Sequence, residues 1–242
     1  MTTLDIIEII LIALFVIIVV YLMINPRYEA PQWKHAKETG RISKRLKKLY
    51  RSYPDKQRFL NFWFQLERIR NAEIPGELAE LGVYKGESAR IIHAITPERK
   101  LHLFDTFAGF QPDDLLNETG TAATYTPRNF ADCSPQGVKD VLGKSENIVI
   151  HQGHFPESTK GLGEPRFAFV NMDADLYRPT LAGLEYFYPR LSPGGVIIIH
   201  DYNYKWPGLM QAVDEFCKNN SLVAVQMPDK DSSVMIIKAK NK

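Results

Sequence analysis

The hydrophobic positions follow three different patterns along the 242 residues of the chain. Residues 9–24 read IILIALFVIIVVYLMI, which is apolar on every side and carries no charge. Between residues 55 and 70 the apolar side chains recur every three or four positions, which predicts an amphipathic helix that begins at Asp55. From residue 77 onward, short apolar runs alternate with helical stretches. The three patterns predict three kinds of structure.

The first pattern predicts a membrane-spanning helix. From Leu4 to Ile24 the run has 21 residues, close to the roughly 20 that a helix needs to cross the hydrocarbon core of a bilayer. It has neither the basic N-terminal region nor the shorter apolar run and small-residue cleavage site of a secretory signal. A buried helix of a soluble core would be apolar along one stripe only. We therefore assign residues 4–24 to a single transmembrane helix.

The charged residues that follow this apolar run predict how the protein is oriented in the membrane. Residues 27–51 carry nine Lys or Arg against two acids, a net charge of +7. Positive residues beside a span usually stay in the cytoplasm, so we expect a single-pass membrane protein whose bulk faces the cytoplasm. We assign residues 25–54 to a basic juxtamembrane segment, which either contacts anionic lipid head groups or is simply solvated. A nucleic-acid partner is not expected, because the segment has no base-stacking pattern. The two cysteines, Cys133 and Cys217, have no metal or redox spacing, as in a reducing cytoplasm.

Residues 55–242 are predicted to form one α/β domain. Strands that are apolar on both faces and alternate with helices are typical of a parallel sheet covered on both sides. The last two strands, LVAVQMP and VMIIKA, are joined by DKDSS, which is too short for a crossover helix, so we expect an antiparallel hairpin. Residues 108–135 are expected to form a long functional or mobile loop. The earlier strands are expected at residues 77–83, 100–106, 147–153, 166–174 and 194–202.

Polar residues at the end of the first strand suggest a ligand site, because ligands of such sheets bind beyond the carboxyl ends of the strands. Glu80 ends the strand, Gly82 and Gly86 lie where the chain turns, and Ser88 starts the next helix. Glycines there let backbone N–H groups and the helix N-terminus approach a ligand, although ordinary tight turns look the same. The spacing differs from GxGxxG and lacks GK[ST], which disfavours a nicotinamide-dependent dehydrogenase.

The next two strands also end in polar residues. Asp105 follows Glu80 by about 25 residues, a distance at which a carboxylate accepts the hydroxyls of a ribose. Gln152 ends the third strand and is placed to reach the edge of an adenine. For both residues, an ordinary turn is the alternative.

The fourth and fifth strands end in DAD and HD. Neighbouring strands lie about 4.8 Å apart, so Asp173, His200 and Asp201 are expected to converge at one edge. These groups would repel one another or stay poorly satisfied without a cation among them. A hard divalent ion is the natural occupant, and solvated turn residues are the alternative.

Six motifs together resemble, in order and spacing, the macrocin O-methyltransferase (TylF-like) family. The resemblance covers about residues 66–219 and leaves out the apolar run and the basic segment. Members are class I S-adenosylmethionine enzymes with a Rossmann-like fold that methylate sugar hydroxyls with a divalent metal, usually Mg²⁺. The motifs are Glu80-x-Gly82-x-x-x-Gly86-x-Ser88, FDTFAGF, FADCSPQGVKDVL, QGHFPEST, DADLYRPT and GGVIIIHDY.

The resemblance implies roles for particular residues. Asp173, His200 and Asp201 would be the metal ligands. The family commonly has two adjacent aspartates where this chain has His200 and Asp201, and an imidazole favours Mn²⁺, Fe²⁺ or Zn²⁺ over Mg²⁺. The implied cofactor-binding residues are Glu80, Gly82, Tyr84, Gly86, Ser88, Asp105, Thr106, Gln152 and Gly153.

The chemistry of methyl transfer predicts a base near the metal. A sugar hydroxyl is a poor nucleophile at pH 7, so we expect a divalent ion to activate it and a base to take its proton. Asp173, Asp175, His154 and His200 are the candidates for that base. We expect a metal-dependent O-methyltransferase acting on a sugar or glycolipid at the membrane, and a homodimer stays open. The alternative is a membrane-tethered S-adenosylmethionine-binding protein without catalysis.

Overall fold

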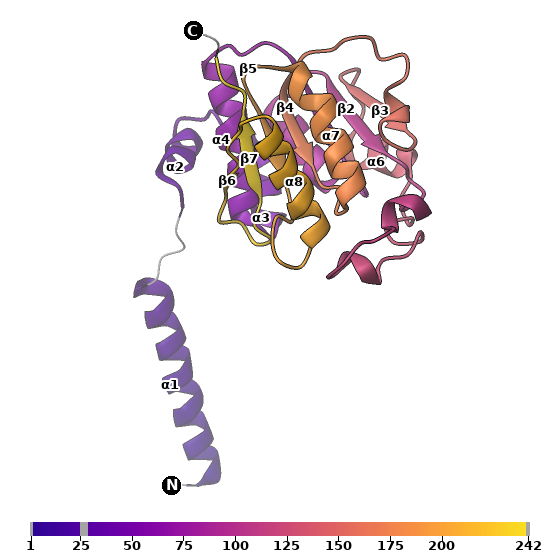
Figure 1. Ribbon diagram of the computed structural model, residues 1–242. Coiled ribbons are helices and arrows are strands. Elements are labelled where there is room, and N and C mark those ends of the chain that lie inside the picture. The colour runs from indigo at the N-terminus through magenta and orange to yellow at the C-terminus, as the bar shows by residue number, and fades with distance from the viewer. Residues whose placement is uncertain (1, 25–28, 241–242) are drawn as a thin grey trace. The chain divides into compact units, whose positions relative to one another are not determined.

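The computed structural model describes residues 2–24 and 29–240 and divides the chain into two compact units, Met1–Ser43 and Lys44–Lys242 (Figure 1). The first unit holds helix α1 (Thr3–Ile24) and helix α2 (Pro31–Glu38). Within α1, the stretch Thr3–Tyr21 is long and apolar enough to cross a membrane, by length and composition, and none of it is buried. Arg27, one of the cations of the predicted basic segment, lies outside the described residues.

The second unit is built on a seven-stranded sheet with the order β3-β2-β1-β4-β5-β7-β6. Strands β1 to β5 run parallel, β7 pairs antiparallel with β5, and β6 pairs antiparallel with β7. The predicted mostly parallel sheet with a C-terminal antiparallel hairpin is thus confirmed. The strands are β1 (Glu77–Leu81), β2 (Leu101–Asp105), β3 (Ile148–Gln152), β4 (Phe167–Met172), β5 (Leu191–Ile199), β6 (Val225–Gln226) and β7 (Val234–Ile237).

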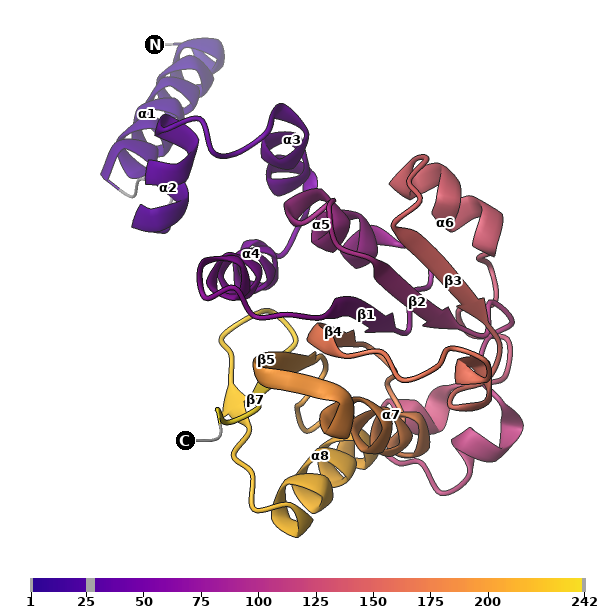
Figure 2. The same cartoon turned by 90° about the horizontal axis from the view of Figure 1, so that it is seen from above.

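Helices cover both faces of this sheet. Figure 2 shows α4 and α5 on one face and α7 and α8 on the other. Helices α3 and α6 both pack against α5, so α3 belongs to the folded domain, ahead of the boundary that we expected at residue 55. The helices are α3 (Lys44–Ser52), α4 (Lys56–Asn71), α5 (Glu87–Ile95), α6 (Pro135–Leu142), α7 (Tyr177–Arg190) and α8 (Pro207–Asn219).

Helix α4 is the predicted amphipathic helix. The Asp55 side chain caps it by accepting a hydrogen bond from the Arg58 backbone N–H at 2.9 Å. Its apolar stripe, which includes Phe62 and Leu66, is fully buried against β4 and β5. Burying a side chain of this size contributes roughly 1.5–3 kcal/mol. This packing places the first turn of α4 near the carboxyl ends of the strands.

The chain order of the sheet reverses between β1 and β4, which are neighbours at its centre. Every residue of β4 is buried, as expected for a strand with helices on both faces. The carboxyl ends beside this reversal are where ligands bind in open α/β sheets. The predicted long loop after β2 runs past this edge and contains two short 3₁₀ helices, η1 (Pro112–Leu115) and η2 (Ala122–Thr124).

Candidate active site

A cavity of about 600 Å³ lies at the carboxyl ends of β1, β2, β4 and β5. Most of the site residues expected from the sequence reach its wall, whereas Glu80, Gly86, Gln152 and His200 do not. The expected residues in the wall are Gly82, Tyr84, Ser88, Asp105, Thr106, Gly153, His154, Asp173, Asp175 and Asp201.

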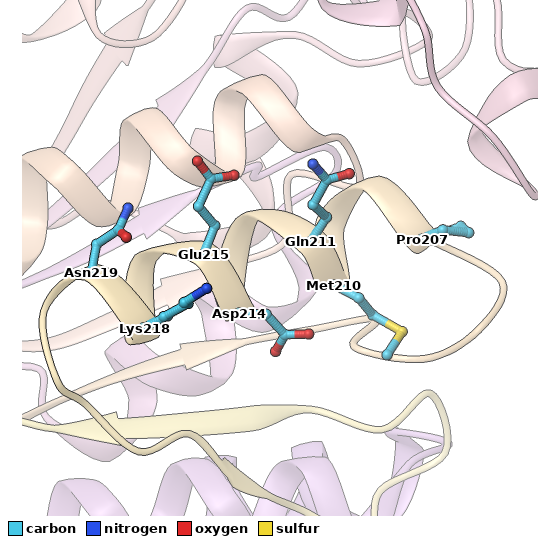
Figure 3. Close-up of a pocket in the computed structure, with 7 residues that line it drawn as sticks. All are labelled: Pro207, Met210, Gln211, Asp214, Glu215, Lys218 and Asn219. Atoms are coloured by element: carbon cyan, nitrogen blue, oxygen red, sulfur yellow. The ribbon is translucent and has the colours of Figure 1, made fainter.

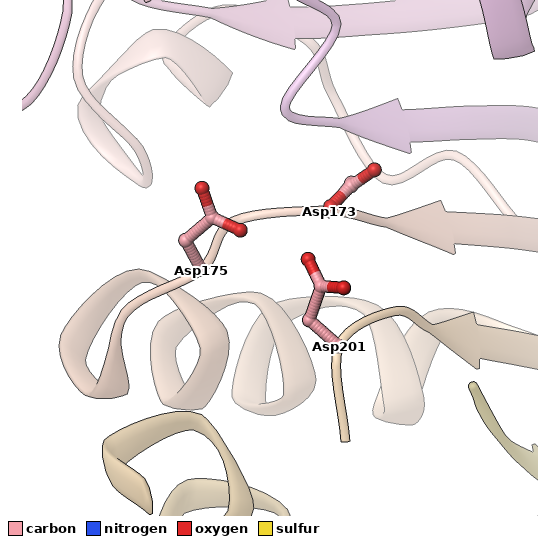
Figure 4. Close-up of side chains that lie close together, drawn as sticks. All are labelled: Asp173, Asp175 and Asp201. Atoms are coloured by element: carbon pink, nitrogen blue, oxygen red, sulfur yellow. The ribbon is translucent and has the colours of Figure 1, made fainter. Parts of the chain in front are cut away.

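Three carboxylates gather at one end of this cavity. Asp173 and Asp175 follow β4 and Asp201 follows β5, and one oxygen of each lies within 4.8 Å of the others. Figure 4 shows the three side chains at the ends of these two strands. Asp175 and Asp201 have left-handed backbone conformations, with φ of 60° and 59°. Such conformations are uncommon outside glycine and cluster at functional sites.

The three carboxylates crowd one another, and Asp201 can form hydrogen bonds with Asp173 and Asp175 only where one carboxyl of a pair carries a proton. Burial and the charge of Asp173 raise the pKa of Asp201 to about 7. Burial and the charges of Asp173 and Asp201 also raise the pKa of Asp175 well above its usual value. Burial raises the pKa of Asp173, although the cation of Arg58 opposes this shift. Either protons or a cation therefore stabilise the cluster.

Arg58 is a functional candidate that the sequence analysis missed. Its guanidinium lies 3.9 Å from a carboxylate oxygen of Asp173 and 3.6 Å from one of Asp231, too far for hydrogen bonds. Its Nε and Nη2 atoms are buried and have no hydrogen-bond partner among the described residues. The surrounding carboxylates raise the pKa of Arg58 although burial opposes them. Arg58 thus supplies one fixed positive charge to a site with three carboxylates.

The turn after β1 brings the backbone close to the end of β4. Gly82 has a φ of +83°, and a Cβ there would lie 1.9 Å from the backbone oxygen of Asp173. Only glycine fits at this position. Gly86 is also left-handed, with φ of 78°, and precedes α5 as its N-cap. The two glycines therefore shape the turn, and Gly82 also lines the cavity.

Asp105 holds the same turn in place. Its Oδ2 accepts the backbone N–H groups of Val83 and Tyr84, both at 2.8 Å, and its Oδ1 accepts the N–H of Phe107 at 2.7 Å. These bonds occupy three of the roughly four acceptor positions of a carboxylate. Its predicted contact with a ribose stays a prediction. Thr106 lines the wall beside it, and its hydroxyl donates to the Gly109 carbonyl at 2.6 Å.

Glu80 is completely buried beneath the cavity wall. Its Oε1 accepts hydrogen bonds from the Ser88 hydroxyl and, at 2.8 Å, from the side-chain amide of Asn171. Its Oε2 has no hydrogen-bond partner among the described residues. Burial raises the pKa of Glu80 to about 8. Glu80 thus supports Ser88, which lines the cavity, from behind the wall.

The structure does not place His200 among the metal ligands. Its Nε2 lies 2.7 Å from Asn171 Oδ1 and its Nδ1 lies 2.7 Å from Ser233 Oγ, and the ring is buried. Because Asn171 donates its amide to Glu80, its Oδ1 accepts, and His200 Nε2 carries the proton. Burial lowers the pKa of His200 well below its usual value. The expectation that His200 is a ligand or a base is therefore corrected.

The alternation of side chains explains this correction. Consecutive residues leave a strand toward opposite sides, so His200 and Asp201 face different surroundings although they are adjacent. The ring of His200 packs edge-on to Phe62 of α4, with ring centroids 5.7 Å apart. Asp175, two residues beyond Asp173, supplies the third member of the cluster instead.

His154 and Gln152 also differ from expectation. The Gln152 side chain is exposed and does not line the cavity, so the predicted contact with adenine is not seen. His154 Nε2 lies 2.7 Å from Asp114 and its Nδ1 lies 3.0 Å from Glu157. Burial lowers the pKa of His154, but these two carboxylates outweigh it and raise the pKa overall. An imidazolium held between two acids is a poor base, which favours Asp173 or Asp175.

The residues present fit both a divalent cation and an extended polar cofactor. Three carboxylates with raised pKa values form an all-oxygen donor set, which suits a hard cation such as Mg²⁺ or Mn²⁺. On the other side of the cavity, the close turn at Gly82 and the side chain of Ser88 offer a cradle for a ligand.

The sequence model of the family Macrocin-O-methyltransferase (TylF) matches residues 30–235. The chain belongs to the macrocin O-methyltransferase family. The resemblance seen in the motifs is thereby confirmed. The match includes α2 and the whole sheet apart from the last two residues of β7, and begins after α1.

Curated relatives in the macrocin O-methyltransferase family carry sugar-related names. The chain is 28% identical over 162 residues to the 8-demethyl-8-(2,3-dimethoxy-alpha-L-rhamnosyl)-tetracenomycin-C 4′-O-methyltransferase of Streptomyces olivaceus, and covers 60% of each protein. It is 29% identical over 181 residues to the Mycinamicin III 3″-O-methyltransferase of Micromonospora griseorubida, covering 66% of this chain and 67% of the relative. The chain thus spans about three fifths to two thirds of the length of these relatives.

Solved structures confirm the fold. The O-methyltransferase NovP aligns with a TM-score of 0.66 at 22% identity, over 76% of this chain and 81% of that protein. The calicheamicin methyltransferase CalS11 aligns with a TM-score of 0.60 at 22% identity, over 87% of this chain and 94% of that protein. Similarity at this level of identity supports the class I methyltransferase fold of the domain.

Proposed function

We propose that this chain is an S-adenosylmethionine-dependent O-methyltransferase that uses a divalent cation. The cluster of Asp173, Asp175 and Asp201 in the wall of the cavity carries the proposal. Membership of the macrocin O-methyltransferase family supports the reaction type. With His200 outside the cluster, the donor set is all oxygen, so Mg²⁺ is the first candidate and Mn²⁺ the second.

Different residues of the chain have different roles in this reaction. S-adenosylmethionine would supply an electrophilic methyl group, and the cation would supply Lewis acidity toward the acceptor hydroxyl. Asp173 and Asp201 would hold the cation, while the turn at Gly82 and Ser88, which is hydrogen-bonded to Glu80, would hold the cofactor. The carboxylate of Asp175, which lies in the same cluster and in the cavity wall, would accept the hydroxyl proton.

A sugar hydroxyl is the proposed methyl acceptor. The two curated relatives are named for methylation of glycosylated natural products. In this chain the cavity wall also includes Phe110, Tyr125 and Trp206, and the rings of Phe110 and Tyr125 stack at 5.3 Å. Apolar and aromatic walls with a few polar groups are typical of sites that orient small molecules and exclude water.

We further propose that α1 anchors the enzyme in a membrane, with the methyltransferase domain facing the cytoplasm. The length and composition of Thr3–Tyr21 and the cations that follow it support this proposal. An anchored enzyme would meet a lipid-linked or membrane-proximal sugar. If deletion of α1 left turnover on a soluble glycan and on a glycolipid equally unchanged, a lipid-linked acceptor would be ruled out.

The reaction is tested with the full chain and labelled S-adenosylmethionine. Transfer of label to extracted host glycans and glycolipids is expected with Mg²⁺ and is expected to stop with a chelator. Asp173→Asn should abolish transfer, whereas Glu146→Gln, an exposed acid before β3, should not change it. Transfer that survives both chelation and Asp173→Asn would contradict a metal-dependent enzyme.

A further inference from the structure

A basic hollow lies on the domain away from the proposed active site. It has a volume of about 340 Å³ and is formed where α3, α5 and the end of α6 meet. Three cations line it, with one acid at the rim: Arg45, Lys48, Arg90 and Asp140. None of these residues lines the catalytic cavity.

The cations of the basic hollow have no acidic partner in the described part of the chain. No carboxylate of the described residues forms an ion pair with Arg45, Lys48 or Arg90. The Arg45 side chain donates to the backbone oxygen of Leu142 at 2.7 Å. The Nε of Arg90 is buried and has no hydrogen-bond partner in the described part of the chain. Asp140 accepts a hydrogen bond from Gln136 at 2.8 Å.

The pKa of the neighbouring His93 is also affected by the positive charge of the basic hollow. Burial lowers the pKa of His93 first, and the charge of Arg45 lowers it further. The Nδ1 of His93 is also buried without a hydrogen-bond partner among the described residues. A second positive charge is therefore disfavoured in this region, whereas an anion would be stabilised.

The sequence of α3 produces this surface. Leu46 and Leu49 are buried, and α3 packs against α5. Arg45 and Lys48, three residues apart, share a neighbouring face of α3 and are exposed. The packing of α3 on α5 brings this face beside Arg90.

A second hollow of the same domain provides a contrast. Figure 3 shows it along the outer face of α8, where Lys218 lies among Asp214 and Glu215. Two acids there outnumber the single cation. The basic hollow thus differs from this second hollow in the sign of its net charge.

We propose that the basic hollow binds the phosphate group of an anionic phospholipid. Arginine guanidinium groups match phosphate oxygens with paired hydrogen bonds, and a lysine adds a point charge. We assign the phosphate to a lipid because α1 is proposed to anchor the enzyme in a membrane, and this assignment rests on that proposal. Only 19 residues lie between Ile24 and Lys44, so α3 stays within about 70 Å of the end of the anchor helix.

The proposal is tested by calorimetry on the full chain in a neutral detergent. Dihexanoyl phosphatidic acid should bind, and inorganic phosphate should compete with it more weakly. Dihexanoyl phosphatidylcholine should not bind. Arg90→Gln should weaken binding of the phosphatidic acid at least about tenfold, and Lys48→Gln, which removes no hydrogen bond within the described protein, should weaken it severalfold. Lys218→Gln removes one charge from α8 and should leave binding unchanged.

Each outcome decides one part of the proposal. Equal binding by the wild type, Lys48→Gln and Arg90→Gln, or no binding at all, would overturn the site. Inorganic phosphate that binds as tightly as phosphatidic acid would overturn the lipid as its source. Binding of S-adenosylmethionine to the same samples is expected to persist in every variant, which separates failure of this site from failure of the proposed methyltransferase.

Discussion

Asp201 and His200 are adjacent in the chain, yet they belong to two regions that differ in how their polar groups are satisfied. Asp201 joins Asp173 and Asp175 in the cavity wall, where the carboxylates crowd one another. His200 joins a buried chain of hydrogen bonds that runs through Asn171 to Glu80 and through Ser233. Buried polar groups joined by hydrogen bonds between neutral donors and acceptors stabilise the fold, whereas carboxylates that crowd one another need protons or a cation, which is typical of a ligand site.

The buried chain crosses four neighbouring strands. Glu80 lies on β1 and Asn171 on β4, while His200 follows β5 and Ser233 precedes β7. The backbone N–H of Ser233 continues the chain by donating to Asp229 Oδ1 at 2.6 Å. The chain thus links the cofactor side of the site to the C-terminal hairpin. We interpret His200 as a positioning residue that holds Asn171 and Glu80.

The largest expected effect distinguishes the candidate bases. Asp175→Asn should lower kcat by a factor of about 10² to 10⁴, because it removes the group proposed to take the hydroxyl proton. His154→Gln should lower kcat less than about fivefold, because His154 is already held by Asp114 and Glu157. Steady-state methyl-transfer kinetics measure both. The reverse ranking would move the base to His154.

The next effect concerns stability rather than chemistry. His200→Ala should destabilise the domain by about 2–4 kcal/mol, because it removes a buried ring and leaves Asn171 and Ser233 without a partner. Thermal unfolding of the full chain should show a lower melting temperature. His200→Gln should lose less stability than His200→Ala, because the glutamine amide can form hydrogen bonds. An unchanged melting temperature for His200→Ala would contradict the positioning role.

Much of the fold was predictable because it depends on local periodicity. The apolar runs that end at Asp105 and Asp173 are strands, and the repeat after Asp55 is a helix. The short DKDSS connection was sufficient to predict the hairpin. The N-terminal boundary of the domain was harder to predict, because the basic face of α3 resembles a solvated linker. Leu46 and Leu49 of α3 are nevertheless buried in the domain.

The site was less predictable, because its composition depends on side-chain direction and on distant packing. Proximity to strand ends correctly indicated that Asp173 and Asp201 meet. It did not show that His200 points to the other side or that Asp175 turns back through a left-handed backbone. Arg58 could not be found at all, because only the packing of α4 on β4 and β5 brings it to the carboxylates.

The smallest expected effect is a pH dependence of stability. The pKa values of Asp201 and Glu80 in the folded protein are about 7 and about 8, above the roughly 4 of unfolded carboxyls. Between these values the folded state binds more protons than the unfolded state, so stability falls as the pH rises. The melting temperature in chelator should therefore decrease from pH 5.5 to pH 8.

A divalent cation should change this dependence, because metal ligands bind in their deprotonated form. The increase in melting temperature on adding Mg²⁺ should be greater at pH 8 than at pH 5.5. The same increase at both pH values, or none, would argue against metal binding by the carboxylates. Asp201→Asn provides the control, since it should reduce the increase in melting temperature that Mg²⁺ causes.

The most direct test compares the two adjacent residues in one titration. Binding of Mn²⁺ to the full chain is measured by calorimetry for the wild type, Asp201→Asn and His200→Gln. We predict that Asp201→Asn weakens the affinity for Mn²⁺ at least about tenfold. The affinity of His200→Gln for Mn²⁺ should stay within about threefold of that of the wild type. A loss of affinity in His200→Gln with none in Asp201→Asn would contradict the separation of the two regions.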